Sequence, residues 1–132
     1  MSGSIANIMK RLSGIAVLLG LLVVLLTACG GPAATDGPNP VHMNSVDFLQ
    51  PLITIKKGET VTLINDAAAV HYIENGTWDN GTQRPGIEPG APKVDTQVGG
   101  NASSTLGPFN TAGTFKLYCT VHPSMNLTVI VK

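Results

Sequence analysis

The chain has 132 residues, with eight acidic and eight basic side chains and therefore no formal net charge at pH 7. The length fits one domain, and the absence of a basic run or a basic excess excludes a protein that binds nucleic acid by collecting phosphates. The same balance gives no indication of a strongly charged docking face for a protein partner.

Residues 1–28 have the features of an export signal, with Lys10 and Arg11 before an apolar run from Ile15 to Leu26. Small residues precede Cys29, and this segment resembles a bacterial lipobox, which implies cleavage before Cys29 and attachment of lipid to it. A transmembrane anchor with an incidental cysteine is the alternative, but the apolar run is shorter than the roughly 20 residues of a spanning helix. We therefore expect a lipoprotein signal peptide and an extracytoplasmic protein that is anchored to the cell membrane.

Residues 29–40 are expected to form a lipidated tether, because they are rich in glycine and proline and show no apolar period. Fully extended, Gly30 to Pro40 would reach at most roughly 35 Å, enough to hold a domain away from a membrane. Without residues 1–28 the chain keeps six basic and eight acidic side chains, a formal charge of −2. Residues 41–132 are then the folded domain, which we expect to be a monomer.

Two strands are predicted between Val41 and Leu63, joined by a turn at Lys57-Gly58-Glu59. Apolar residues recur at spacings that suit the inward face of paired strands: Phe48, Ile53, Ile55, Val61 and Leu63. His42 and Met43 could be suggested as metal ligands, but neither has a ligand-spaced partner nearby, so we expect surface or strand positions.

A further alternating run leads through Asn65 to His71, a candidate metal ligand. Asn65 has two interpretations. It either ties the loop before His71 to the ligand-bearing strand by side-chain hydrogen bonds, or it is a plain turn residue. The sequence does not decide between them.

Residues 74–104 are rich in glycine and proline and have no apolar period, with Asn75-Gly76 and Asn80-Gly81 as turn signals. We expect a long loop or hairpin excursion that lies either near the candidate metal site or across the surface of the domain. Trp78, the only tryptophan, either pins this segment to the domain or contacts a partner. Pinning is the commoner role of a lone aromatic residue in such a segment.

Two half-buried strands are predicted at the end of the chain, since apolar residues alternate there with polar ones. The inward set is Phe115, Leu117 and Cys119, followed after a loop by Leu127, Val129 and Val131. Another strand is expected at Thr105–Phe109, with a turn at 110–113. No helix is expected after residue 28, so the predicted fold is an all-β Greek-key sandwich or barrel.

The loop between the last two strands presents Cys119, His122 and Met125 at three-residue intervals. A thiolate, imidazoles and a weak axial thioether form the ligand set of a trigonal copper site, and His71 supplies the second imidazole. The alternative is a buried structural thiol, because Cys119 has no possible disulfide partner except Cys29. The same ligands would also accept zinc.

The strand Gly113–Cys119 followed by Cys-x-x-His-x-x-Met, with Asn65 and His71 upstream, resembles the cupredoxins. The short loop is similar to that of the amicyanin group, and the resemblance covers roughly residues 41–73 and 105–132. It implies one type 1 copper ion held by four ligands: His71, Cys119, His122 and Met125. It also implies that the edge of the His122 ring is exposed as the port for an electron.

The function implied by this resemblance is that of a blue copper protein, a one-electron carrier between a redox donor and a redox acceptor. The alternative is a copper trafficking or storage protein without an electron-carrier role, because such a protein would use the same ligands. A copper enzyme is disfavoured, since Met125 would fill the axial position that a substrate needs.

Overall fold

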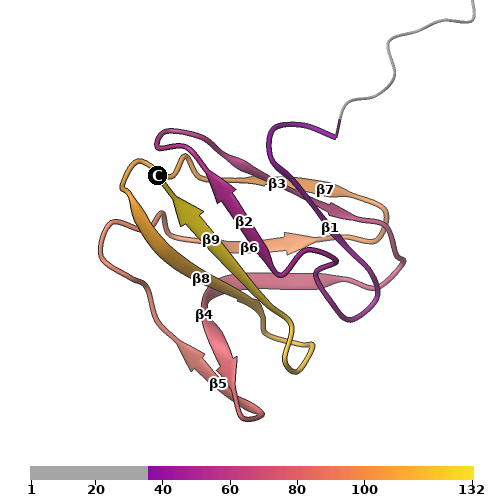
Figure 1. The fold of residues 1–132 in the computed structure, drawn as a ribbon. Coiled ribbons are helices and arrows are strands. Elements are labelled where there is room, and N and C mark those ends of the chain that lie inside the picture. The colour runs from indigo at the N-terminus through magenta and orange to yellow at the C-terminus, as the bar shows by residue number, and fades with distance from the viewer. Residues whose placement is uncertain (1–35) are drawn as a thin grey trace, which may run out of the picture. The chain divides into compact units, whose positions relative to one another are not determined.

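The computed structural model describes residues 36–132, and within them it contains nine strands and no helix (Figure 1). The expected signal peptide over residues 1–28, Cys29 and most of the tether lie outside the described residues. In residues 36–132 no helix is long and apolar enough to cross a membrane.

The strands form two sheets. In the three-stranded sheet, β3 (Val61–Asn65) pairs in parallel with β1 (Pro40–Met43) and antiparallel with β7 (Ser103–Leu106). The second sheet has the order β2, β9, β8, β4, β5, and β6 also pairs with β4. β6 pairs with the first half of β4, from His71 to Glu74, and β5 pairs with the second half, from Gly76 to Asp79. Its strands are β2 (Leu52–Ile55), β4 (His71–Asp79), β5 (Thr82–Pro85), β6 (Asp95–Val98), β8 (Gly113–Cys119) and β9 (Asn126–Val131).

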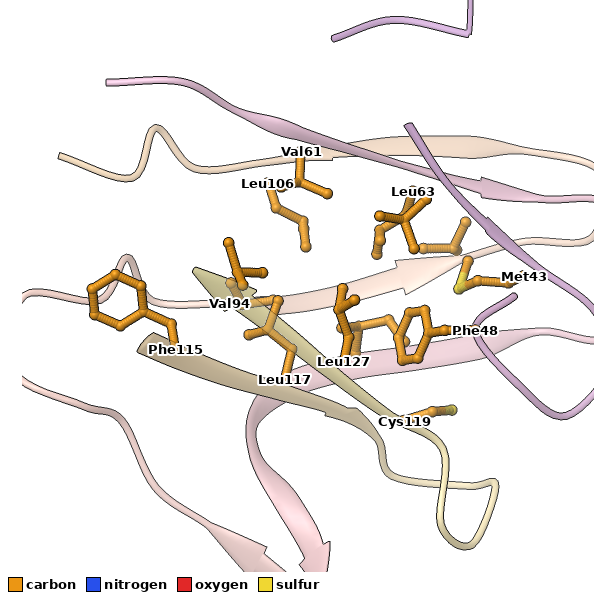
Figure 2. Packing of buried hydrophobic residues seen from close by; sticks show 14 of the residues in the cluster. Met43, Phe48, Val61, Leu63, Val94, Leu106, Phe115, Leu117, Cys119 and Leu127 are labelled. Carbon is orange, nitrogen blue, oxygen red and sulfur yellow. The ribbon is translucent and has the colours of Figure 1, made fainter. Parts of the chain in front are cut away.

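The two sheets face each other across one hydrophobic core (Figure 2). Val61 and Leu106 from the first sheet point toward Leu117 and Leu127 from the second, and Cys119 lies toward one end of the core. All the residues predicted to point inward from the last two strands are buried: Phe115, Leu117, Cys119, Leu127, Val129 and Val131. The predicted all-β sandwich and the alternation of its last two strands are therefore confirmed.

The turn at Lys57-Gly58-Glu59 is present, but the strands on either side of it do not pair as predicted. Glu59 N–H donates to Lys56 O at 3.1 Å, and Gly58 has a φ of 88°. β2 pairs with β9, whereas β3 pairs with β1 and β7, so this turn carries the chain from one sheet to the other. Apolar alternation identifies the inward face of a strand without identifying its neighbour.

Of the two alternatives for residues 74–104, the long loop is wrong, because most of β4 and all of β5 and β6 lie there. The hairpin is confirmed for β4 and β5, which pair antiparallel. The turn signal at Asn80-Gly81 is confirmed. Their φ values of 48° and 76° are both positive, as a two-residue hairpin turn requires. Asn75-Gly76 instead lies inside β4, where Gly76 has a φ of 133° and a Cβ would collide with the backbone of β5.

The folded unit also begins before the expected boundary at residue 41. Pro40 is the first residue of β1, and the side-chain amide of Asn39 donates to Thr60 O at 2.8 Å. The Thr62 N–H donates to Pro38 O at 3.1 Å. The last residues of the expected tether are therefore held by hydrogen bonds to β3 and the turn before it.

Candidate metal centre

His71, Cys119 and His122 come together at one end of the sandwich. His71 begins β4 and Cys119 ends β8, and these neighbouring antiparallel strands align Ile73 with Cys119. One donor atom from each of the three side chains lies within 4.8 Å of the other two. The Cys119 Sγ is 3.3 Å from His122 Nδ1, and the centroids of the two imidazole rings are 4.7 Å apart.

The His71 ring has a defined orientation. Its Nε2 lies 2.9 Å from the carbonyl oxygen of Asn44, and because a carbonyl can only accept, Nε2 carries the proton. Nδ1 is then the unprotonated nitrogen, and it is buried with no hydrogen-bond partner among residues 36–132. Burial and, to a smaller degree, the neighbouring His122 lower the pKa of His71, while the hydrogen bond to Asn44 acts in the opposite direction. The imidazole is therefore neutral near pH 7, with a free lone pair on Nδ1.

The loop after Cys119 is closed by hydrogen bonds of its own backbone. The Cys119 N–H donates to Met125 O at 3.0 Å, and the Met125 N–H donates to His122 O at 3.3 Å. Pro123 and Ser124, which has a φ of 67°, occupy the two central positions of this turn, an arrangement typical of type II. The Met125 side chain is fully buried. Three predicted ligands, Cys119, His122 and Met125, thus belong to one closed loop, and the fourth, His71, begins β4.

The unpaired Nδ1 atom of His71 indicates that this cluster binds a metal ion. A buried polar atom without a partner costs about 1–3 kcal/mol, and His71 Nδ1 bears that cost beside a buried thiol and a second imidazole. Two imidazoles and a thiol are donors that copper prefers, and a buried thioether adjoins them in the loop. The residues present therefore fit one type 1 copper ion.

The two interpretations of Asn65 are resolved by its contacts. The buried side-chain amide donates to Ala69 O at 2.6 Å and to Gly99 O at 2.9 Å, and its Oδ1 accepts from the Ala67 N–H at 3.1 Å. Asn65 therefore ties the loop before His71 to the turn between β6 and β7. This fixes the path of the chain into the strand that begins with His71.

Replacement of Asn65 by alanine is expected to destabilise the metal-free domain by about 1–3 kcal/mol, because it leaves three partly buried backbone groups without their side-chain partner. Chemical denaturation of the metal-free protein measures this change. Asn110→Ala is the matched control, since Asn110 is exposed and surface changes usually stay within about 0.5 kcal/mol. Equal stability of the two variants would contradict the role assigned to Asn65.

His42 and Met43 lie on β1, as expected for strand residues. Met43 is fully buried in the core, and His42 Nδ1 is 2.8 Å from Asp66 Oδ2, apart from the ligand cluster. Sequence reasoning missed Asn44, whose contribution is a backbone carbonyl and therefore leaves no side-chain signal. It anticipated that Trp78 pins its segment, and the indole Nε1–H does donate to Cys119 O at 2.8 Å.

Comparison with known proteins agrees with this geometry. Residues 37–132 match the sequence profile of the family described as copper binding proteins, plastocyanin/azurin family. An oxidised methionine-to-leucine variant of amicyanin is 26% identical with a TM-score of 0.59, over 75% of this chain and 86% of that chain. Amicyanin from Paracoccus versutus (Thiobacillus versutus) is 25% identical with a TM-score of 0.55, over 80% and 88% respectively. No curated protein gives a significant match to the chain.

Proposed function

Since the chain belongs to the plastocyanin/azurin family of copper-binding proteins, the cupredoxins, we propose that it is a one-electron carrier with a type 1 copper site. The proposed ligands are His71, Cys119, His122 and Met125. When bound, copper supplies the one-electron redox couple Cu(II)/Cu(I), which a protein can use for electron transfer without turning over a substrate. The chain is accordingly proposed to be a carrier and not an enzyme.

The observation that supports this proposal most directly is the unpaired, buried Nδ1 of His71 beside Cys119 and His122. Backbone hydrogen bonds hold the thiol-bearing residue and the start of β4 in a packed sandwich. Donor atoms held in this way change position little when the metal changes its charge, and a small rearrangement favours fast electron exchange.

His122 is the proposed port for the electron, because it is half-buried whereas the other imidazole, of His71, is fully buried. Its neighbour Val121 is 51% exposed, and Val70 and Tyr72 at the start of β4 are exposed as well. We propose that the redox donor and acceptor proteins dock on this apolar end of a monomeric domain. No nucleic acid takes part, because the described domain has no basic excess.

We further propose that the domain is held at the extracytoplasmic face of a membrane. The support is the sequence of residues 1–28, with its basic start, short apolar run and small residues before Cys29. Lipid on Cys29 would provide the anchor, and the residues between Cys29 and the start of the fold near Pro38 would provide reach.

The absorption and electron-spin resonance spectra of the oxidised, copper-loaded protein test the proposed function. A carrier should show intense visible absorption from a copper–thiolate bond and the resonance of a type 1 site. A colourless protein that retains Cu(I) and releases it readily to a chelator would instead indicate a copper delivery or storage protein. Failure to bind copper in either oxidation state would contradict both functions.

Replacement of Met125 by leucine is expected to raise the reduction potential while copper and the visible absorption are retained. The thioether is a weak axial donor that favours the oxidised metal slightly, and leucine fills a similar volume. Cyclic voltammetry of the loaded protein measures the change. Met43→Leu is the matched control, because Met43 is also fully buried but is not a proposed ligand. Equal potentials in the two variants would remove Met125 from the ligand set.

A further inference from the structure

The hairpin formed by β4 and β5 lies at the end of the domain that carries the ligand loop (Figure 1). Trp78, near the end of β4, is half-buried, and its indole meets the ring of Tyr118 edge-on with centroids 6.2 Å apart. Tyr118 immediately precedes Cys119. The hairpin therefore packs against the part of β8 that delivers the thiol.

The peptide group between Cys119 and Thr120 is held on both sides. Its carbonyl oxygen accepts a hydrogen bond from Trp78 Nε1–H at 2.8 Å, and its N–H donates to Tyr72 O at 2.9 Å. The next carbonyl, of Thr120, accepts from Gln83 Nε2 on β5, also at 2.8 Å. Because this peptide directly follows the thiol-bearing residue, fixing its plane fixes the direction in which the Cys119 side chain leaves the backbone.

Trp78 also reaches the other end of the loop. Its backbone N–H donates to Asn126 Oδ1 at 2.7 Å, and its carbonyl accepts from Asn126 Nδ2 at 3.1 Å. Asn126 is the first residue of β9 and follows Met125. One residue of the hairpin thus bonds to both flanks of the loop that carries three of the four proposed ligands.

We propose that Trp78 is a positioning residue for the copper site, which bridges Cys119 and Asn126 and so keeps the ligand loop closed with its donor atoms in place. The inference rests on the proposed function for the identity of the metal, whereas the bridging itself belongs to the metal-free domain. The hydrogen bonds of Trp78 reach the Cys119 carbonyl, the Asn126 side chain and the Thr77 hydroxyl. It therefore acts on the ligand loop through the Cys119 backbone and through Asn126. A tryptophan that served only as packing would need its ring against Tyr118 but not its indole N–H.

Trp78→Phe separates these roles, since it removes the N–H and keeps an aromatic ring. In the metal-free protein we expect the Thr120 amide hydrogen to exchange with solvent about threefold to tenfold faster, the effect of losing one ordinary hydrogen bond on a local opening. The Asn65 amide, which is bonded to Ala102 O at 2.9 Å in the other sheet, is the reference and should not change. NMR-detected hydrogen exchange measures both amides.

Arg84→Ala is the matched control within the hairpin, because in the described part of the chain the Arg84 side chain pairs with Asp79 alone, at 3.9 Å. It should leave exchange at Thr120 unchanged. If Trp78→Phe fails to fold, Gln83→Met removes the neighbouring hydrogen bond and should also speed exchange at Thr120 alone. Unchanged exchange in the hydrogen-bond variants, or an equal increase at Thr120 and Asn65, would overturn the proposal.

A second measurement uses the copper-loaded protein. Trp78→Phe should shift the energy and relative intensity of the copper–thiolate absorption bands, which depend on the placement of the Cys119 sulfur, and Arg84→Ala should not. Identical spectra in the wild-type protein and Trp78→Phe would overturn the positioning role. If the wild-type protein takes up no copper, the proposed function fails, while the exchange rates still decide whether Trp78 holds the loop.

Discussion

Replacement of Cys119 by serine is expected to abolish the intense visible absorption of the copper-loaded protein while the domain stays folded. The absorption arises from the copper–thiolate bond, and serine offers no thiolate. Serine has nearly the size of cysteine, and its hydroxyl can bond to His122 Nδ1, which lies 3.3 Å from the native sulfur. A buried hydroxyl with a partner costs little, so thermal unfolding should remain cooperative. Absorption and circular dichroism of the variant measure the two effects.

Val121→Ala is the control for this experiment. Val121 lies in the same loop, between Cys119 and His122, but its side chain is exposed and offers no donor atom. The variant should keep the full absorption. A Cys119→Ser protein with an unchanged spectrum would remove Cys119 from the metal site, and the proposed function would be lost with it.

Replacement of Cys29 by alanine is expected to move the protein from the membrane fraction to the soluble fraction, with its copper spectrum intact. Without the cysteine no lipid can be attached, and the four proposed copper ligands all lie between His71 and Met125, within the folded domain. A single acyl chain gives only marginal membrane binding, so loss of the whole lipid should release the protein completely. Fractionation of cells followed by immunoblotting measures the distribution.

Cys119→Ser provides the opposite pattern as a control, because it should lose the colour and stay in the membrane fraction. Incorporation of a labelled fatty acid into the wild-type protein, and none into Cys29→Ala, would identify the lipid directly. Recovery of Cys29→Ala in the membrane fraction would instead favour an uncleaved helix over residues 1–28 as the anchor.

The sequence predicted the parts of the fold in which burial alternates along a strand. β8 and β9 are such strands, with Leu117 and Leu127 aligned across them. Cys119 at the end of β8 and His122 in the short loop that follows come together as expected. The candidate ligands could be recognised because their chemistry requires particular side chains at a fixed spacing. What alternation did not provide was the pairing of β2 with β9, since neighbours depend on contacts between segments distant in the chain.

The strands that were missed have no apolar alternation. All four residues of β5 are exposed, and β4 contains Asn75, whose buried side chain pairs with Pro92 O and the Val94 N–H. A polar side chain that satisfies backbone groups inside a strand has the same sequence signature as a turn residue. The hydrogen bonds from the His71 ring to the Asn44 carbonyl and from the Trp78 indole to the Cys119 carbonyl join segments that are distant in the chain. In each pair the acceptor is a backbone group, so no local sequence pattern indicates these bonds.

The burial of Cys119 also determines which molecules can react with its sulfur. Thiols in oxidising compartments are consumed by mixed-disulfide formation and by conversion to sulfenic acid, and both reactions need a sulfur that another molecule can touch. Cys119 has no exposed surface, so a disulfide-exchange enzyme or a small-molecule disulfide cannot reach it without opening the loop. The folded domain without metal therefore protects this thiol from those reactions for as long as the loop stays closed.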